Sequence, residues 1–196
     1  RVGVTAGLHL DDLLTPVTVI DEDIMDANIA AAQRVADDAG IAFRPHIKTH
    51  KLPFVAERQI RAGATGINCQ KLSEAQVFAD AGFNDILITF NMLGPERLQH
   101  LGELNQRITL SVTADNAQVV QGLAGHFGPA RPLAVLVECE TGAERCGVQT
   151  PRDALELALL IAAAPGLRFR GLMTYPRGGG EARGRLFDLA LRGDAV

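Results

Sequence analysis

Apolar and polar residues follow two alternating patterns along this chain. Short runs rich in β-branched residues are followed by longer windows in which apolar residues recur every three or four positions, and these patterns predict strands and amphipathic helices. The predicted strands are residues 16–21, 41–48, 65–70, 85–90, 107–112, 131–139 and 169–175. The predicted helices are residues 22–40, 52–64, 71–82, 94–104, 116–127, 151–164 and 181–193.

The first predicted helix is rich in alanine and carries one clear apolar stripe. Ile24, Ala27, Ala31 and Val35 recur at helical spacing, and Gly40 follows as a residue suited to ending a helix. These four side chains therefore lie on one face of the predicted helix.

The cores of the predicted strands are nearly continuous apolar runs, as in residues 85–89 and 133–137. Such runs are typical of strands covered on both faces, which is the situation in a parallel sheet with helices outside it. Repeated β/α units then fold either as a doubly wound open sheet or as a (β/α)8 barrel. No GxGxxG motif follows the first strand, and this lowers the expectation of a dinucleotide-binding fold.

The number of strands predicts an incomplete barrel. If residues 16–21 are a lead-in strand, about six barrel strands remain, whereas a closed barrel has eight strands and usually about 250 residues. An open piece of this kind would leave unpaired parallel edges. We expect residues 1–196 to form one α/β domain, a (β/α)8 TIM-type barrel that is only partly present.

Composition excludes some classes of partner. The chain has 196 residues and a net charge of -4, which gives no reason to expect nucleic acid. No apolar run of about 18 residues predicts a membrane span, and the first residues show no secretion signal. The three cysteines, Cys69, Cys139 and Cys146, form no CxxC pair and read as free thiols in a reducing compartment, so we expect a cytoplasmic protein.

Polar side chains stand where the predicted strands end. In a β/α barrel, catalytic groups lie at the carboxyl ends of the strands. Lys48, Gln70, Asn91, Glu138 and Tyr175 occupy such positions. We therefore expect a lysine, a glutamine, acidic groups and a tyrosine to converge on one mouth.

Lys48 follows an apolar strand and is flanked by His46 and His50 in the stretch FRPHIKTHK. An amine that is partly desolvated and close to other cations gains nucleophilic character, as a Schiff base requires. An ordinary surface lysine in a basic loop fits the same position. The two histidines do not predict a zinc site, because no further ligands occur at suitable spacing.

Arg145 and Tyr175 each allow two interpretations. Arg145, in the turn ETGAERCGV, fits a guanidinium aimed at an anionic oxygen, or a loop arginine paired with Glu140 or Glu144. Tyr175, which is the only tyrosine, fits a hydrogen-bond partner for a heteroaromatic ring nitrogen, or an aromatic plug at the barrel rim.

Four segments taken together resemble one family of enzymes. RPHIKTHK, INCQKLSEAQVFADAGFNDILI, LVECETGAERCGV and GLRFRGLMTYP occur in the order found in the N-terminal barrel of D-threonine aldolase and D-serine dehydratase-like enzymes. These are pyridoxal 5'-phosphate (PLP) enzymes of the alanine racemase fold type. The resemblance extends from about residue 15 to residue 176.

The resemblance implies a role for each matching residue. Lys48 matches the lysine that forms the Schiff base with PLP, and Arg145 matches the arginine near the phenolic oxygen of the cofactor. Tyr175 matches the residue near the pyridine nitrogen. Gln70 is expected to contact the cofactor, and His50 to position the substrate or act as a base.

The resemblance also implies an activity. We expect a lyase for D-β-hydroxy amino acids, first of all a D-threonine aldolase that releases glycine and an aldehyde. The alternatives are elimination of the D-serine dehydratase type, a racemase or a PLP-binding protein of the same fold, and a barrel that does not use PLP.

Parts of the family pattern lie outside the chain. The family has a C-terminal β-domain with a metal-binding pair, so a divalent metal (Mn, Mg or Zn) would be held by residues outside these 196. The seventh and eighth barrel strands, whose loops cradle the PLP phosphate, are also missing, and MTYP departs from the wording of well-known aldolases. The expected partners are a small D-amino acid and a second copy of the chain in a homodimer.

Overall fold

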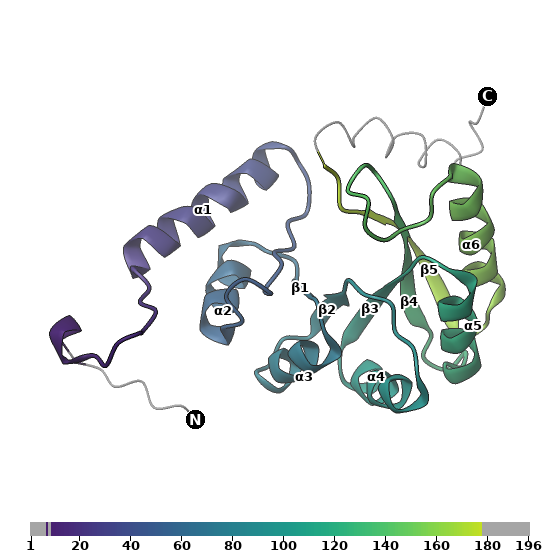
Figure 1. The fold of residues 1–196 in the computed structure, drawn as a ribbon, viewed down its shortest axis with the longest axis horizontal. Helices are drawn as coiled ribbons and strands as arrows, with labels where there is room; N and C mark the ends of the chain where they lie inside the picture. Colours follow the sequence, from purple (N-terminus) through teal and green to yellow (C-terminus); the bar gives the residue numbers. More distant parts are fainter. Residues whose placement is uncertain (1–6, 8, 178–196) are drawn as a thin grey trace.

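The computed structural model describes Gly7 and residues 9–177, which form a curved parallel sheet with helices outside it (Figure 1). The sheet has five strands in the order β1-β2-β3-β4-β5, and every neighbouring pair is parallel. The strands are β1 (Ile67–Cys69), β2 (Asp85–Ile88), β3 (Thr109–Ala114), β4 (Leu133–Cys139) and β5 (Leu167–Thr174). Strand order that follows chain order, with a helix in each connection, is the arrangement of part of a β/α barrel.

Six α-helices and one short 3-10 helix lie within the described residues. They are η1 (Leu10–Asp12), α1 (Glu22–Asp38), α2 (Pro53–Ala62), α3 (Leu72–Asp80), α4 (Pro95–Arg107), α5 (Ala117–His126) and α6 (Pro151–Ala163). Proline opens α2, α4 and α6, where its missing N–H removes no helical hydrogen bond. The predicted helix over residues 181–193 lies outside the described residues.

The main core lies between the strands and the helices α2 to α6. Alternate strand residues such as Ile86, Val112 and Val135 are fully buried and pack with helix residues such as Phe78 and Leu123. Because strand side chains alternate between the two faces, the residues between them point to the inside of the curve. The helices therefore cover the outer face of the sheet, and the alternate strand side chains occupy its inner face.

The inner face of the sheet carries polar groups. Ser111, Thr113 and Glu138 are all buried, yet they lie outside the apolar cluster. Thr113 Oγ1 lies 3.4 Å from Glu138 Oε2, and Arg170 reaches across from β5 to donate to Ser111 Oγ at 2.6 Å. Buried polar groups are stable when they have hydrogen-bond partners, and the inner face supplies these from strand to strand.

The predicted strand over residues 41–48 is present as an extended segment with a single bridge, between His46 and Asn68. Asn68 N–H donates to Pro45 O at 2.8 Å, and Ile47 N–H donates to Asn68 O at 2.9 Å. Pro45 has no N–H to continue the parallel ladder toward the start of the segment. The segment therefore occupies the place of a sixth strand beside β1, but the regular strands number five within residues 9–177.

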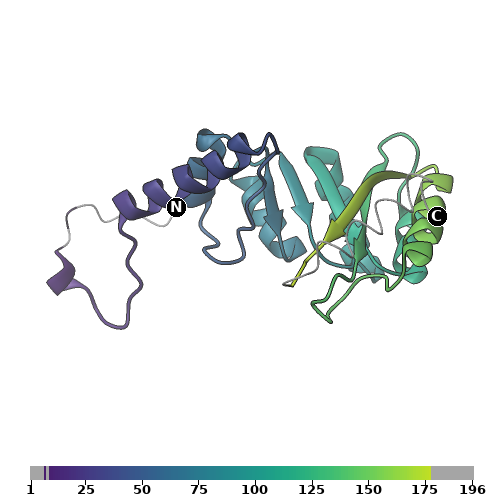
Figure 2. The ribbon, with the colours of Figure 1, turned by 90° about the horizontal axis from the view of Figure 1, so that it is seen from above.

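The prediction of a strand over residues 16–21 is wrong. These residues lie outside every strand of the described chain, and Val17 and Val19 are exposed. A strand needs a neighbour for its backbone groups, and Figure 2 shows this part of the chain reaching away from the sheet together with α1.

The apolar stripe of α1 is not its buried face. Ile24, Ala27, Ala31 and Val35 are all exposed, and the buried residues of the helix are Gln33 and Ala36. Among the described elements, α1 packs mainly against α2. The helical period was correct, but the period alone does not say which neighbour a stripe will meet.

Candidate active site at the carboxyl ends of the strands

Lys48 lies at the rim where the parallel strands end. The preceding residue, Ile47, is fully buried, and the chain turns sharply after Lys48 with Lys51 N–H donating to Ile47 O at 2.8 Å. Lys51 has a φ of 54° in this turn, and its Nζ lies 3.2 Å from Glu74 Oε1 on α3. The turn that presents Lys48 is thus fastened to the neighbouring β/α unit.

Three of the residues expected at the site come together around one aromatic ring. Lys48 Nζ lies 5.4 Å from the centroid of the Tyr175 ring, and the Arg145 guanidinium carbon lies 4.4 Å from the same centroid. Both distances are in the range of cation–π contacts. Lys48 ends the extended segment beside β1, Arg145 lies in the loop after β4, and Tyr175 follows β5. The curvature of the sheet brings them together.

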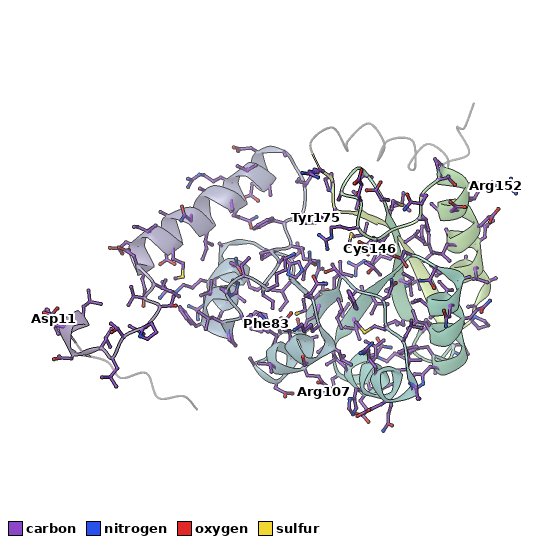
Figure 3. The ribbon with its side chains drawn as sticks, in the orientation of Figure 1. Asp11, Phe83, Arg107, Cys146, Arg152 and Tyr175 are labelled. Carbon is purple, nitrogen blue, oxygen red and sulfur yellow. The ribbon has the colours of Figure 1, made fainter. Side chains whose placement is uncertain are left out.

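Tyr175 lies at the carboxyl end of the strands in Figure 3, close to Cys146 and away from Phe83 and Arg107 at the opposite end. Within the described part of the chain, Lys48 and Arg145 form no salt bridge. An amine, a guanidinium and a phenol therefore share one end of the sheet, and both cations remain available to an anionic ligand.

Glu140 shapes the loop that carries Arg145. Its Oε1 accepts the backbone N–H groups of Gly142 at 2.7 Å and Glu144 at 2.9 Å. Gly147 closes the loop with a φ of 111°, where a Cβ would lie 2.5 Å from Glu140 N. A side chain at position 147 would collide with β4, so glycine is required for the loop to fold back and hold Arg145 over Tyr175.

Gln70 lies on the Lys48 side of the same edge. Its backbone N–H donates to Glu74 Oε2 at 2.9 Å, and its side-chain Nε2 is 3.4 Å from Thr89 O. Its side chain also forms a hydrogen bond with His46. Burial lowers the pKa of His46, and this hydrogen bond opposes that effect. The structure therefore places Gln70 within the polar inner rim next to the segment that leads to Lys48.

His50 is oriented differently. Its Nδ1 accepts the Leu52 N–H at 3.0 Å, at the start of α2, and its ring lies beside Gln59 of that helix. Burial is the main cause that lowers the pKa of His50. In the described chain, its contacts are with the α2 region and not with the cluster around Tyr175.

Glu138 and Asp115 are acidic groups of the inner rim. Glu138 was expected at the mouth without a specific role, and Asp115 was not among the candidate residues. Asp115 accepts Asn91 Nδ2 and Asn116 Nδ2, each at 2.8 Å, and Gly147 N–H at 3.0 Å. Burial raises the pKa of Glu138; a hydrogen bond with the Cys146 thiol opposes this, and Asp115 adds to it. Period-two alternation along the predicted strand over residues 131–139 was the available signal for Glu138, whereas Asp115 lies beyond the predicted strand over residues 107–112.

The described residues contain no group of three or more His, Cys, Asp or Glu side chains able to hold a metal ion. The three cysteines are free, with Cys69 and Cys139 buried and Cys146 half-buried. Burial raises the pKa of the Cys69 and Cys139 thiols to about 12, so these two thiols are inert packing groups. No helix in the described part of the chain has the length and apolar character needed to cross a membrane.

Comparison with known proteins defines the class. The family model of the alanine racemase N-terminal domain matches residues 20–184, and the chain belongs to this family. The fold is accordingly part of the TIM-like barrel of that domain.

Individual relatives narrow the comparison. The chain is 43% identical over 164 residues to D-threonine aldolase from an Arthrobacter species, which covers 82% of this chain and 43% of that protein. It is 38% identical over 165 residues to D-threo-3-hydroxyaspartate dehydratase from Delftia sp. strain HT23, with 82% and 43% covered. The chain spans about half the length of the curated relatives it matches.

A solved structure agrees with this placement. The crystal structure of D-threonine aldolase from Filomicrobium marinum superposes with a TM-score of 0.85 at 33% identity, over 95% of this chain and 55% of that chain. The relatives are thus enzymes of D-hydroxy amino acids, and the five strands correspond to part of a larger fold.

Proposed function

We propose that this chain is the PLP-binding part of a lyase that acts on D-β-hydroxy amino acids, most simply a D-threonine aldolase. The observation that carries the proposal is the convergence of Lys48 and Arg145 on the Tyr175 ring at the carboxyl ends of the strands. The relatives that are 43% and 38% identical, an aldolase and a dehydratase of such substrates, support the same class.

The side chains present fit an anionic aromatic aldehyde such as PLP. Lys48 supplies a primary amine able to bond covalently to the aldehyde carbon. Arg145 supplies N–H donors for the phenolic oxygen, and Tyr175 supplies a hydroxyl for the ring nitrogen. Gln70 lines the same rim. When bound, PLP provides the electron sink for the charge that develops at the substrate Cα.

The remaining groups would handle the substrate. Cleavage of Cα–Cβ requires a base for the β-hydroxyl proton, and elimination requires a base for the Cα proton. His50 would act as this base only after a change in the orientation of its ring, because the ring faces α2. A divalent metal would polarise the β-hydroxyl and would be held by residues outside this chain.

The wider organisation follows from the same proposal. Residues 1–196 would form one PLP-binding barrel domain, with a C-terminal β-domain outside this chain and a homodimer as the assembly. The free cysteines suit a reducing compartment such as the cytoplasm.

One experiment tests the proposed activity directly. The intact protein is incubated with PLP and D-threonine, with and without Mn²⁺, and glycine and acetaldehyde are measured. We expect both products in equal amounts, loss of turnover with EDTA, and no reaction of L-threonine as the control. Failure to cleave D-threonine in the presence of a bound cofactor and metal would contradict the D-threonine aldolase assignment.

A dehydratase is the second candidate, because the Delftia relative has that activity. The same incubation with D-threo-3-hydroxyaspartate separates the two reactions. Elimination releases ammonia and an oxo acid, whereas aldol cleavage releases glycine. Ammonia without glycine would favour the dehydratase, and interconversion of D- and L-amino acids would favour a racemase.

A further inference from the structure

His46 is a part of the FRPHIKTHK stretch that the proposed function leaves without a role. It lies two residues before Lys48 and is half-buried on the inner side of the sheet edge. The backbone N–H of Lys48 donates to His46 Nδ1 at 3.2 Å. The side chain thus holds the main chain at the residue that the proposed function depends on.

The contacts of His46 define which ring nitrogen carries the proton. Because Nδ1 accepts the Lys48 N–H, Nδ1 has no hydrogen, and a neutral ring must then carry its hydrogen on Nε2. Nε2 lies 3.2 Å from Thr89 Oγ1, which itself lies 3.3 Å from Cys69 O. A carbonyl only accepts, so the Thr89 hydroxyl donates to Cys69 O and accepts the His46 Nε2–H. The donor and the acceptor are therefore defined for each of these three hydrogen bonds.

The chain of contacts ties three neighbouring units together. His46 belongs to the segment before Lys48, Cys69 ends β1, and Thr89 follows β2. The contact between His46 and Thr89 spans 43 residues of sequence. Loss of the His46 side chain would therefore remove the acceptor of the Lys48 N–H and its side-chain link to Thr89, while the backbone bonds between residues 45–47 and Asn68 remain.

His50 provides an internal comparison. Its Nδ1 also accepts the N–H two residues later, that of Leu52 at 3.0 Å. Its ring is half-buried beside Gln59 of α2, whereas His46 Nε2 lies against Thr89. The same local motif thus serves the start of α2 at one histidine and Lys48 at the other.

We propose that His46 is a positioning residue for Lys48, acting as a neutral imidazole that accepts the Lys48 N–H and donates to Thr89. The importance of this role for catalysis rests on the proposed function of Lys48. The arrangement of hydrogen bonds does not depend on that function, so the two can be tested separately.

The electrostatic surroundings agree with a neutral ring. Burial is the main cause that lowers the pKa of His46, followed by the charge of Lys48; a hydrogen bond with Gln70 and the carboxylate of Glu74 on α3 oppose them. The Thr89 side chain, which also faces the ring, carries no charge. Protonation of Nδ1 would remove the acceptor of the Lys48 N–H. This contribution to stability is complete above the ordinary value of 6.5 and is lost as the pH falls toward the lowered folded value.

The first test observes the ring itself in the protein without PLP. Long-range proton–nitrogen NMR spectra distinguish the two neutral tautomers, and the His46 signal is assigned among five histidines by its absence in His46→Asn. We expect the Nε2–H form at neutral pH and a transition below that of a solvent-exposed histidine. A charged ring or an Nδ1–H form at pH 7 would overturn the proposal.

The second test measures the Lys48 N–H by amide hydrogen exchange, again without PLP. His46→Leu removes both ring contacts and should reduce protection of this amide about fivefold to tenfold, the effect of one neutral hydrogen bond. His46→Asn keeps an acceptor for the N–H two residues later and should retain protection. His50→Leu is the matched control, and it should expose the Leu52 amide while leaving Lys48 unchanged.

Thr89→Val keeps the shape of the inner rim and removes the hydroxyl. This variant allows the test to be made even if His46→Leu does not fold. It should shift the His46 transition and leave an intermediate loss of Lys48 protection. Equal protection of Lys48 in the wild type, His46→Leu and Thr89→Val would refute the positioning role.

Measurements of PLP binding then test whether the positioning role of His46 matters for the proposed function of Lys48. His46→Leu should bind PLP about fivefold to tenfold more weakly than the wild type, and His46→Asn within about twofold. If the wild type binds no PLP, the proposed function fails, while the NMR tautomer and the exchange data still decide the role of His46.

Discussion

The helix-facing and inward-facing sides of the same strands have different compositions. The outer side presents residues such as Ile86, Val112 and Val135, which join the apolar core. The inner side presents Thr113 and Glu138, which are equally buried but hydrogen-bonded. Burial alone therefore does not distinguish the two sides; the kind of partner does. This difference separates the part of the strand that maintains the fold from the part that can carry chemistry.

Lys48→Ala should produce the largest effect and tests the inner rim directly. Without the amine no covalent adduct with PLP can form, so both the visible absorption of that adduct and all turnover should disappear. Borohydride reduction followed by peptide mapping checks this in the wild type, where PLP should be found on Lys48. Lys71→Ala, at an exposed lysine, is the control and should keep the adduct. Turnover that survives in Lys48→Ala would remove the central assignment.

Ile86→Ala tests the outer side. This residue is fully buried in the apolar core, and the change should lower the free energy of unfolding by about 2–5 kcal/mol. Urea unfolding measures the loss. The fraction that remains folded should bind PLP with unchanged affinity, because the side chain faces the helices.

Thr113→Val is the matched change on the inner side of the sheet. It keeps the volume of the side chain and removes its contact with Glu138, so its effect on unfolding should be smaller than that of Ile86→Ala. Equal losses of stability in the two variants would mean that the two sides of the sheet do not differ as described.

Arg145→Ala should weaken catalysis by about 10²-fold, as expected for the loss of one electrostatic contact, while the fold remains intact. The measurement is kcat on the substrate identified above, together with the spectrum of bound PLP. Arg152→Ala is a suitable control, because Arg152 is an exposed arginine on α6 paired with Glu156 four residues later. Unchanged kinetics for Arg145→Ala would make it an ordinary loop residue.

Glu138→Gln should have the smallest effect and should appear as a change in pH dependence. Burial raises the pKa of Glu138, so the folded state binds this proton more readily than the unfolded chain does. The wild type should then lose stability as the pH rises from about 4.5 through the raised pKa, and the glutamine variant should lack this loss. Unfolding of both proteins across that range gives the comparison. Parallel curves would contradict a raised pKa for Glu138.

The order of elements was predictable because it depends on local patterns. The helices over residues 52–64, 71–82 and 116–127 occur close to their predicted bounds, since an amphipathic period of 3.6 residues is written in neighbouring positions. The strand over residues 16–21 was not, because a β-branched run forms a strand only where another segment pairs with it. The segment of residues 41–48 is an intermediate case. It is extended beside β1, as predicted, but it forms a single bridge because Pro45 has no N–H to continue the ladder.

The positions of the candidate residues were easier to predict than their contacts, and their roles stay predictions. Residues at strand ends were found by position, and Lys48, Arg145 and Tyr175 do meet. His46 and His50 flank Lys48 symmetrically in the sequence. The structure separates them, because Thr89 lies opposite one ring and α2 opposite the other.

The succession of strands and helices, the family resemblance and the polar residues at the strand ends could be read from the sequence, because all of these follow from neighbouring residues. Three features required the folded chain: the face of α1 that is buried, the histidine that contacts the Lys48 backbone, and the position of Glu138 beside Asp115 and Cys146. These outcomes depend on contacts between segments far apart in the chain, and such contacts exist only once the curvature of the sheet brings the segments together.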